Sequence, residues 1–279
     1  SYAKVAGTTN TVTTDTSANA GYGMTPDAWG DLAEQFRLWN TTRTVLRTEL
    51  NYSMGPSAAV KSGINGAGVD VALIDTGVAP VKGIGDPSKL VYGPDLSFES
   101  QIPALTHLDT FGHGTFMAGL IAGRDPEAVA PYSSNPATTY LGVAPDARIV
   151  SLKVAAQDGG TDVSQVIAAI DWVVQHRTDA GLNIRVLNLS YGTFSTQAST
   201  VDPLAYAVEQ AWKTGIVVVA AAGNNGYQHG SHTTGLANPA YDPAILAVGG
   251  SDDAGTATVA DDVPGAYTAS GHKVRNPDL

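Results

Sequence analysis

The chain has 279 residues, enough for one large domain or two small ones, and its 15 Lys and Arg against 26 Asp and Glu give a net charge of -11. This acidic balance excludes the basic surface that nucleic-acid-binding proteins use, so no nucleic-acid partner is expected. The absence of cysteine excludes disulfides and thiolate metal sites. No apolar stretch approaches the ~18 residues of a membrane span, and the first residues of this sequence do not predict a signal peptide. The charge-poor, acidic composition favours a secreted or extracellular protein.

The first part of the chain differs in character from the rest. Residues 8–20 are polar and Thr-rich, which predicts a flexible arm because few apolar side chains are present to offset the entropy of ordering. Residues 25–40 predict one amphipathic helix, with apolar side chains at helical spacing: Trp29, Leu32, Ala33, Phe36 and Trp39. We therefore predict an N-terminal extension over residues 1–55 and one main domain over residues 56–279.

In the main domain, apolar strands alternate with helices. The predicted strands are short and rich in β-branched residues, at 69–75, 147–154, 185–192, 216–224 and 245–251. Helices are expected from about residue 113, from a cap at Thr161 or Asp162, and from Pro203 to a stop at Gly215. This alternation predicts a doubly wound α/β fold, in which helices flank a mostly parallel sheet. Ligands bind such sheets beyond the carboxyl ends of the strands.

Polar residues stand where three of these strands end. Asp75 ends the first, the Ser190–Tyr191–Gly192 segment ends the third, and Asn224 ends the fourth. Each residue taken alone is typical of a turn, since Asp, Asn and Gly are common turn residues. His113, between two glycines, stands where the next helix begins. Because a helix N-terminus disfavours an imidazolium, a carboxylate must stabilise the protonated form if His113 transfers protons, and Asp75 is the candidate.

Six segments in order resemble the signature blocks of the subtilisin-like serine proteases, or subtilases. They read "VALIDTGV", "FGHGTFMAGLIAG", "LGVAPDARIVSLKV", "LNLSYG", "VVVAAAGNNG" and "NPAYDPAILAVGG" and lie within residues 57–279. The resemblance implies a serine endopeptidase in which Asp75 orients His113, His113 is general base and then general acid, and Asn224 is an oxyanion donor. It also implies that Ser190, Tyr191 and Gly192 pair with an extended peptide or protein substrate. The wall of the specificity pocket is then formed by Ala221, Ala222 and Gly223.

The nucleophile of the family is missing from this sequence. The family's serine lies in a Gly-Thr-Ser-Met-Ala block that no segment here matches, and the serines after Asn224 are Ser231, Ser251 and Ser270 in unrelated contexts. We therefore expect a catalytic domain that is truncated at the C-terminus before the serine. On this interpretation the given chain is inactive alone, and its own C-terminal segment is an expected partner.

Two further departures concern the surroundings of the histidine. A second histidine often follows the family's His-Gly-Thr, and here Phe116 takes that place. A calcium loop often follows the histidine helix. The corresponding residues 124–140 hold few carboxylates, with Asp125 and Glu127 as candidate ligands. The chemistry requires no cofactor, and the sequence does not support structural calcium at that loop.

Two other functions stay open at this point. A non-catalytic, subtilase-like peptide-binding module would keep the substrate groove but needs none of Asp75, His113 and Asn224. A metal-dependent hydrolase would use His107, Asp109 and His113, or the pair His229 and His232, which are plausible nitrogen and oxygen ligands.

Overall fold

The computed structural model describes residues 63–136, 139–195, 197–226, 235–252, 254, 259–271 and 275–279. The predicted N-terminal extension over residues 1–55 and its amphipathic helix lie outside these residues. So do His229, Ser231 and His232. Within the described residues, no helix has the length and apolar character needed to cross a membrane.

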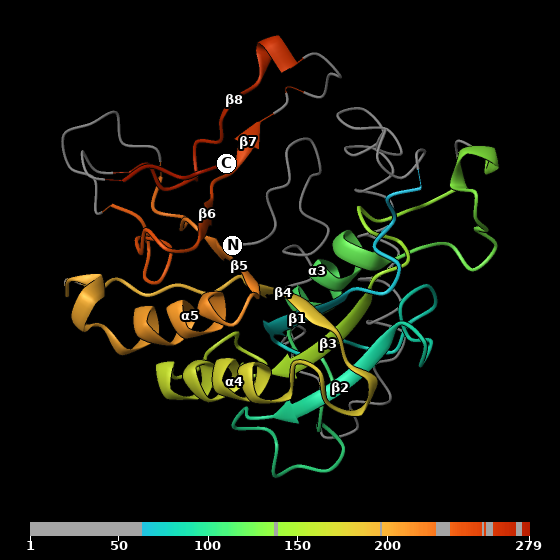
Figure 1. The fold of residues 1–279 in the computed structure, drawn as a ribbon, viewed down its shortest axis with the longest axis horizontal. Coiled ribbons are helices and arrows are strands. Elements are labelled where there is room, and N and C mark those ends of the chain that lie inside the picture. The colour runs from blue at the N-terminus through green and yellow to red at the C-terminus, as the bar shows by residue number, and fades with distance from the viewer. Residues whose placement is uncertain are drawn as a thin grey trace, which may run out of the picture.

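A six-stranded parallel sheet forms the centre of the molecule, and it confirms the predicted doubly wound α/β fold (Figure 1). The strand order is β2-β3-β1-β4-β5-β6. Because every neighbouring pair is parallel, all carboxyl ends lie at the same edge. The bounds are β1 (Asp70–Asp75), β2 (Leu90–Asp95), β3 (Arg148–Lys153), β4 (Ile184–Leu189), β5 (Val217–Ala221) and β6 (Leu246–Val248). A separate antiparallel pair joins β7 (Ser251–Asp252) to β8 (Val263–Pro264).

Helices cover both faces of the sheet. The helix α3 (His113–Ala122) packs on one face, and α4 (Val163–His176) and α5 (Pro203–Lys213) lie together on the other. Alternate side chains of β1 pack against the helices on opposite faces of the sheet. Val71 and Leu73 pack with α3, whereas Ala72 and Ile74 pack with α4 and α5. Short 3-10 turns complete the described elements: η2 (Tyr132–Ser134), η3 (Asp179–Gly181), η4 (Ser199–Val201) and η5 (Val259–Asp261).

The two long helices begin at the residues that the sequence predicts. Asp202 caps α5 by accepting hydrogen bonds from the N–H groups of Leu204 at 2.9 Å and Ala205 at 3.0 Å, and Pro203 takes the first position. Asp162 is the cap residue of α4, and its N–H donates to Gln165 Oε1 at 2.8 Å.

The strand boundaries differ from prediction in four places. β2 is not predicted, because its Gly93 and Pro94 resemble a turn; proline is tolerated there since β2 is an edge strand. β4 ends at Leu189, so the segment 190–192 lies beyond it, and β5 ends at Ala221, before Asn224. The predicted strand 245–251 divides into β6 and the start of β7, because β7 pairs with β8 outside the main sheet.

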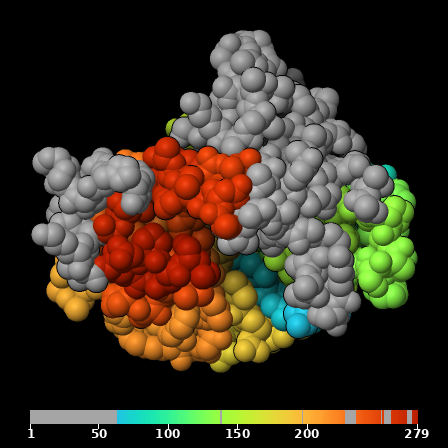
Figure 2. All heavy atoms as spheres, turned by 90° about the horizontal axis from the view of Figure 1, so that it is seen from above, coloured from blue at the N-terminus to red at the C-terminus, as the bar shows by residue number. Residues whose placement is uncertain are grey.

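The C-terminal residues pack against the last strands of the sheet. Gly249 N–H donates to Leu279 O at 2.8 Å, and Ala269 N–H donates to Gly223 O at 2.8 Å. Figures 1 and 2 both place this red segment beside the orange α5 region, with the green segment around residues 124–136 on the opposite side of the molecule.

A buried carboxylate, Asp109, fixes the start of α3. The N-cap residue Gly112 has no side chain with which to satisfy the first N–H groups of the helix. Asp109 is fully buried and accepts from Gly112 N–H at 2.6 Å and Thr115 N–H at 2.8 Å. Three more donors reach it, from Phe111 N–H, Thr115 Oγ1 and Thr76 Oγ1. The negative charge is therefore held by hydrogen bonds and by the positive end of the helix dipole.

The turn after β1 lies directly against this helix start. Thr76 Oγ1 accepts from Gly114 N–H at 2.9 Å while it donates to Asp109. A Cβ atom at Gly114 would lie 2.0 Å from the Gly77 carbonyl oxygen, so only glycine allows this approach. The end of β1 and the start of α3 are thus joined at backbone distance.

We predict that Asp109→Asn lowers the free energy of unfolding by about 3 kcal/mol, because an amide nitrogen in place of one oxygen cannot accept hydrogen bonds from buried donors. Urea unfolding measures the loss. Asp171→Asn is the control, since Asp171 is an exposed partner of Gln175 on α4 and should cost less than about 0.5 kcal/mol. Equal losses in the two variants would contradict the role given to Asp109.

Candidate active site

Asp75 and His113 lie together at the carboxyl edge of the sheet. His113 Nδ1 is 2.7 Å from Asp75 Oδ1 and 2.9 Å from Oδ2, so the contact predicted from sequence is present. Asp75 is the last residue of β1, and His113 is the first residue of α3. Asp75 is held in turn by the N–H of Thr76, which donates to its Oδ1 at 2.8 Å.

The surroundings favour the protonated form of His113. Burial by itself lowers the pKa of the imidazole, but the charge of Asp75 and its hydrogen bond raise it, and the charge of Asp109 adds to them. The net result is a pKa above the ordinary value of 6.5. The carboxylates therefore outweigh the effect of burial on the pKa of His113, and Asp75 supplies the negative charge that a proton-transferring histidine needs.

The arrangement does not favour a metal centre at His107, Asp109 and His113. Both Asp109 oxygens accept hydrogen bonds from protein donors, and His113 Nδ1 faces Asp75. The His107 ring stacks on Tyr92 with a centroid distance of 5.1 Å. In the described part of the chain, no group of three or more His, Asp or Glu side chains is placed to hold a metal ion.

The two predicted substrate segments, 190–192 and 221–223, lie next to each other at the carboxyl ends of β4 and β5. Thr193 N–H donates to Asn238 O at 3.0 Å, which anchors the segment 190–192 at its far end. A Cβ on Gly192 would lie 2.7 Å from Ala237 Cβ, and one on Gly223 would lie 3.2 Å from the same atom. Ala237 therefore lies between Gly192 and Gly223. The absence of a side chain at both glycines lets the two backbone segments come close to Ala237.

The main chain at Tyr191 and Gly192 is available for pairing. Both residues lie beyond the end of β4. Among the described residues, no backbone group donates to or accepts from their N–H and C=O groups. Tyr191 is half-buried and Gly192 is exposed, while the Ser190 hydroxyl accepts from Asn188 Nδ2 at 3.0 Å.

The last residue of β5 and the residues that follow it differ in exposure. Ala221 and Asn224 are exposed, and Gly223 is half-buried with a φ of 114°. Ala222 is only 1% exposed and packs in the core with α4 and α5, while its N–H donates to Val248 O at 2.8 Å. Ala221 and Gly223 are thus the members of this segment that reach the surface.

The segment after α3 uses its carboxylates within the protein. Asp125 is buried and accepts from Tyr140 N–H at 2.9 Å, and exposed Glu127 lies 3.4 Å from Lys82 Nζ. Phe116, in place of the family's second histidine, is half-buried on α3. Our expectation from the sequence, that structural calcium is not supported at this segment, stays a prediction.

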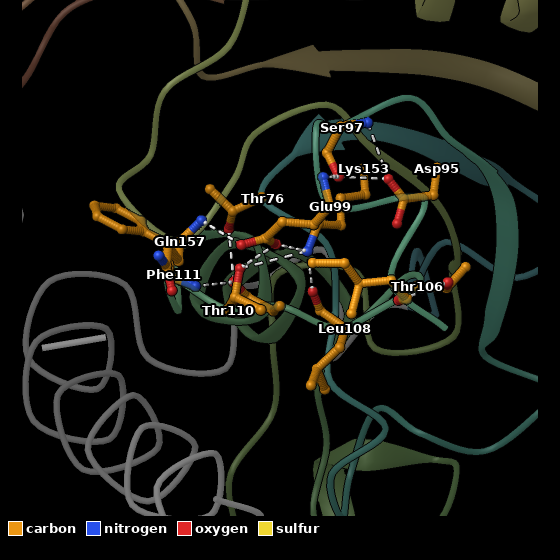
Figure 3. A network of polar contacts seen from close by, with 12 residues as sticks. Thr76, Asp95, Ser97, Glu99, Thr106, Leu108, Thr110, Phe111, Lys153 and Gln157 are labelled. Atoms are coloured by element: carbon orange, nitrogen blue, oxygen red, sulfur yellow. Dashed lines mark hydrogen bonds and ion pairs between the residues drawn. The ribbon is translucent and has the colours of Figure 1, made fainter. Parts of the chain in front are cut away.

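A buried polar network that the sequence does not predict lies beside the site, and Figure 3 shows this network. Its centre is the ion pair between Lys153 Nζ and Glu99 Oε2, at 2.6 Å. A lysine at the end of an apolar strand signals a buried partner, because a buried ammonium must be paired. Nothing in the sequence indicates that the partner is Glu99, which is 54 residues away.

Known proteins resemble this chain over most of its length. A model of the subtilase family matches residues 66–279. Serine protease AprX of Bacillus subtilis strain 168 is 30% identical over 222 residues, 77% of this chain and 46% of that protein. Subtilisin DY of Bacillus licheniformis is 36% identical over 191 residues, 68% of this chain and 59% of that protein. The chain thus spans about half the length of these curated relatives.

Solved structures show the same fold. A cold adapted subtilisin-like serine proteinase superposes with a TM-score of 0.50 at 27% identity, covering 74% of this chain and 61% of the other. The prenylagaramide maturation protease PagA superposes with a TM-score of 0.53 at 23% identity, covering 78% and 64%. Because the family match extends over most of the chain and starts just before β1, the chain belongs to the subtilase family of serine proteases.

Proposed function

We propose that this chain carries the acid–base half of a serine endopeptidase site. The observation that carries the proposal is the 2.7 Å contact between Asp75 and His113 at the carboxyl edge of the sheet. In a triad, the histidine removes the proton of the attacking serine and later gives a proton to the leaving amine. With Nδ1 held by Asp75, both transfers fall to Nε2. Asp75 fixes the tautomer and stabilises the imidazolium that forms.

The other predicted residues complete the proposed reaction. An exposed Asn224 side chain, beyond β5, would donate to the oxyanion of the tetrahedral intermediate. Ser190, Tyr191 and Gly192 would add the substrate backbone as an extra strand, which the unused main-chain groups of Tyr191 and Gly192 support. The substrate is a peptide or protein. Secretion is a further part of the proposal, supported by the acidic, charge-poor composition.

The nucleophile is proposed to be a serine outside the printed 279 residues. Among the remaining candidates, Ser251 is exposed at the start of β7, and Ser270 has a buried hydroxyl without a hydrogen-bond partner among the described atoms. Neither follows the family's Gly-Thr-Ser pattern at a helix start. We therefore propose that the 279-residue chain alone does not hydrolyse peptides.

The pKa of His113 tests the acid–base pair. We predict that Asp75→Asn lowers this pKa, because the main favourable charge is removed while the burial that disfavours the imidazolium remains. An NMR titration of the His113 ring measures it, with Asp171→Asn as the control that leaves it unchanged. An unchanged pKa in Asp75→Asn would show that the pair is not electrostatically coupled.

The same pair predicts a pH dependence of stability. Because folding raises the pKa of His113, the stabilisation is fully present below the unfolded value of about 6.5 and is lost as the pH rises through the folded-state value. Urea unfolding between about pH 5.5 and 9 should show this slope in the native chain, and Asp75→Asn should reduce it. A slope that Asp75→Asn leaves intact would have to come from other groups.

Labelling with a serine-directed phosphonate tests the complete mechanism. We predict no label on the 279-residue chain, since the base has no attacking hydroxyl to deprotonate. A fusion that supplies a segment with the Gly-Thr-Ser-Met-Ala block should be labelled on the supplied serine, as located by mass spectrometry. His113→Ala in the same fusion is the control and should abolish most labelling, because triad members act as a unit.

Two outcomes would contradict the assignment. Label on Ser231, Ser251 or Ser270 of the isolated chain would show that the nucleophile lies within it. A folded fusion that binds peptide but is never labelled would favour the non-catalytic binding module.

A further inference from the structure

The buried ion pair between Lys153 and Glu99 has no part in the proton transfers proposed above. Lys153 is 0% exposed and Glu99 is 6% exposed, and their charged atoms are 2.6 Å apart. Such a pair is weak evidence for stability, because the cost of removing both charges from water offsets most of their attraction. Its position beside the site therefore needs an explanation other than stability.

Lys153 connects the strand next to Asp75 with the segment that leads to His113. It is the last residue of β3 and the direct Cα partner of Asp75 in the parallel ladder. Its ammonium donates to Leu108 O at 2.5 Å, one residue before Asp109. The backbone entering the start of α3 is thus attached to the strand beside Asp75.

Glu99 ties the same segment to the loop after β3. Its Oε2 accepts from Thr110 Oγ1 at 2.7 Å as well as from Lys153, and its Oε1 accepts from Gln157 N–H at 2.9 Å. Figure 3 shows the side chains of Glu99, Lys153 and Thr110 pointing toward one another. The Phe111 ring lies close to that loop, since a Cβ atom added at Gly159 would come within 3.2 Å of it.

We propose that Lys153 and Glu99 are positioning residues that hold the segment 108–112 so that the His113 ring faces Asp75. The inference rests on the proposed role of His113 as the catalytic base. Lys153 fixes the segment relative to β1 and β3, and Glu99 fixes it relative to the loop after β3. If the pair is removed, the segment loses its attachments at Leu108 and Thr110, and the ring moves away from the carboxylate of Asp75.

The direction in which the pKa of His113 changes in Lys153→Met distinguishes a positioning role from a direct effect of the lysine charge. Replacing Lys153 by methionine removes a positive charge near His113, and this change alone would raise the pKa of the imidazole. Movement of the ring away from Asp75 would lower it. Asp75 and Asp109 are the carboxylates that raise the pKa of His113, and both are unchanged in this variant. A fall in Lys153→Met therefore reports displacement.

The experiment is an NMR pH titration of His113 in the 279-residue chain and its variants, with urea unfolding in parallel. We expect the pKa to fall in Lys153→Met and in the charge-neutral double variant Lys153→Met/Glu99→Gln, by less than in Asp75→Asn. Thr110→Val removes one hydrogen bond to Glu99 without changing charge, and it should produce a smaller fall. This variant and the double variant keep the test valid if Lys153→Met does not fold.

The opposite end of the same two strands offers a matched control. Arg148 and Asp70 form a bidentate ion pair there, at 2.7 Å from Nε to Oδ1 and 2.6 Å from Nη2 to Oδ2. The double variant Arg148→Met/Asp70→Asn should lower the urea midpoint but leave the pKa of His113 unchanged.

An unchanged or raised pKa in both Lys153→Met and the double variant would overturn the positioning role. An equal fall in the Arg148→Met/Asp70→Asn control would also overturn it, since any loss of stability would then suffice. Failure of the proposed function is a separate result. In that case Asp75→Asn would not change the pKa of His113, or the serine-supplied fusion would stay unlabelled, whatever Lys153→Met does.

Discussion

The geometry of this site depends on one buried carboxylate, Asp109. It accepts hydrogen bonds from the turn after β1 through Thr76 and from the start of α3 through Gly112 and Thr115. These two elements carry Asp75 and His113, so the same oxygens that satisfy the helix start also join the two backbone segments that hold the pair. An uncompensated buried charge is far more costly than a lost surface contact. The positions of the turn after β1 and of the start of α3 around Asp109 can therefore vary little.

The fold could be predicted from sequence to the extent that each element carries its own periodicity. The strand 69–75 is apolar on both faces because helices cover both faces, and α5 carries its cap and its proline in the sequence. The edge strand β2 was missed because an edge position removes the constraints that make a strand recognisable. Its half-exposed residues need not be apolar, and Pro94 breaks no ladder in the sheet interior.

The residues of the candidate site also differ in whether the sequence predicts them. Asp75 and His113 were predicted because a strand end and a helix start are local signals, and the resemblance to the subtilases gave them an order. The sequence brings Asp109 into consideration only as a metal ligand, in the alternative of a metal-dependent hydrolase. A sequence does not distinguish a carboxylate that faces a cation from one that faces N–H groups, since both environments supply positive charge. Glu99 could not be predicted, because only the folded chain brings it to Lys153.

The charges around His113 have a consequence for the pH range of the proposed chemistry. Asp75, Asp109 and Glu99 are buried at this edge of the sheet, and Lys153 is a fully buried cation paired with one of them. With Glu99 compensated by Lys153, Asp75 and Asp109 act together on the imidazole and raise its pKa. A general base must be neutral before it can accept the proton of a serine. The same carboxylates that stabilise the imidazolium during the reaction thus lower the fraction of free base at a given pH, and this favours the proposed activity at higher pH.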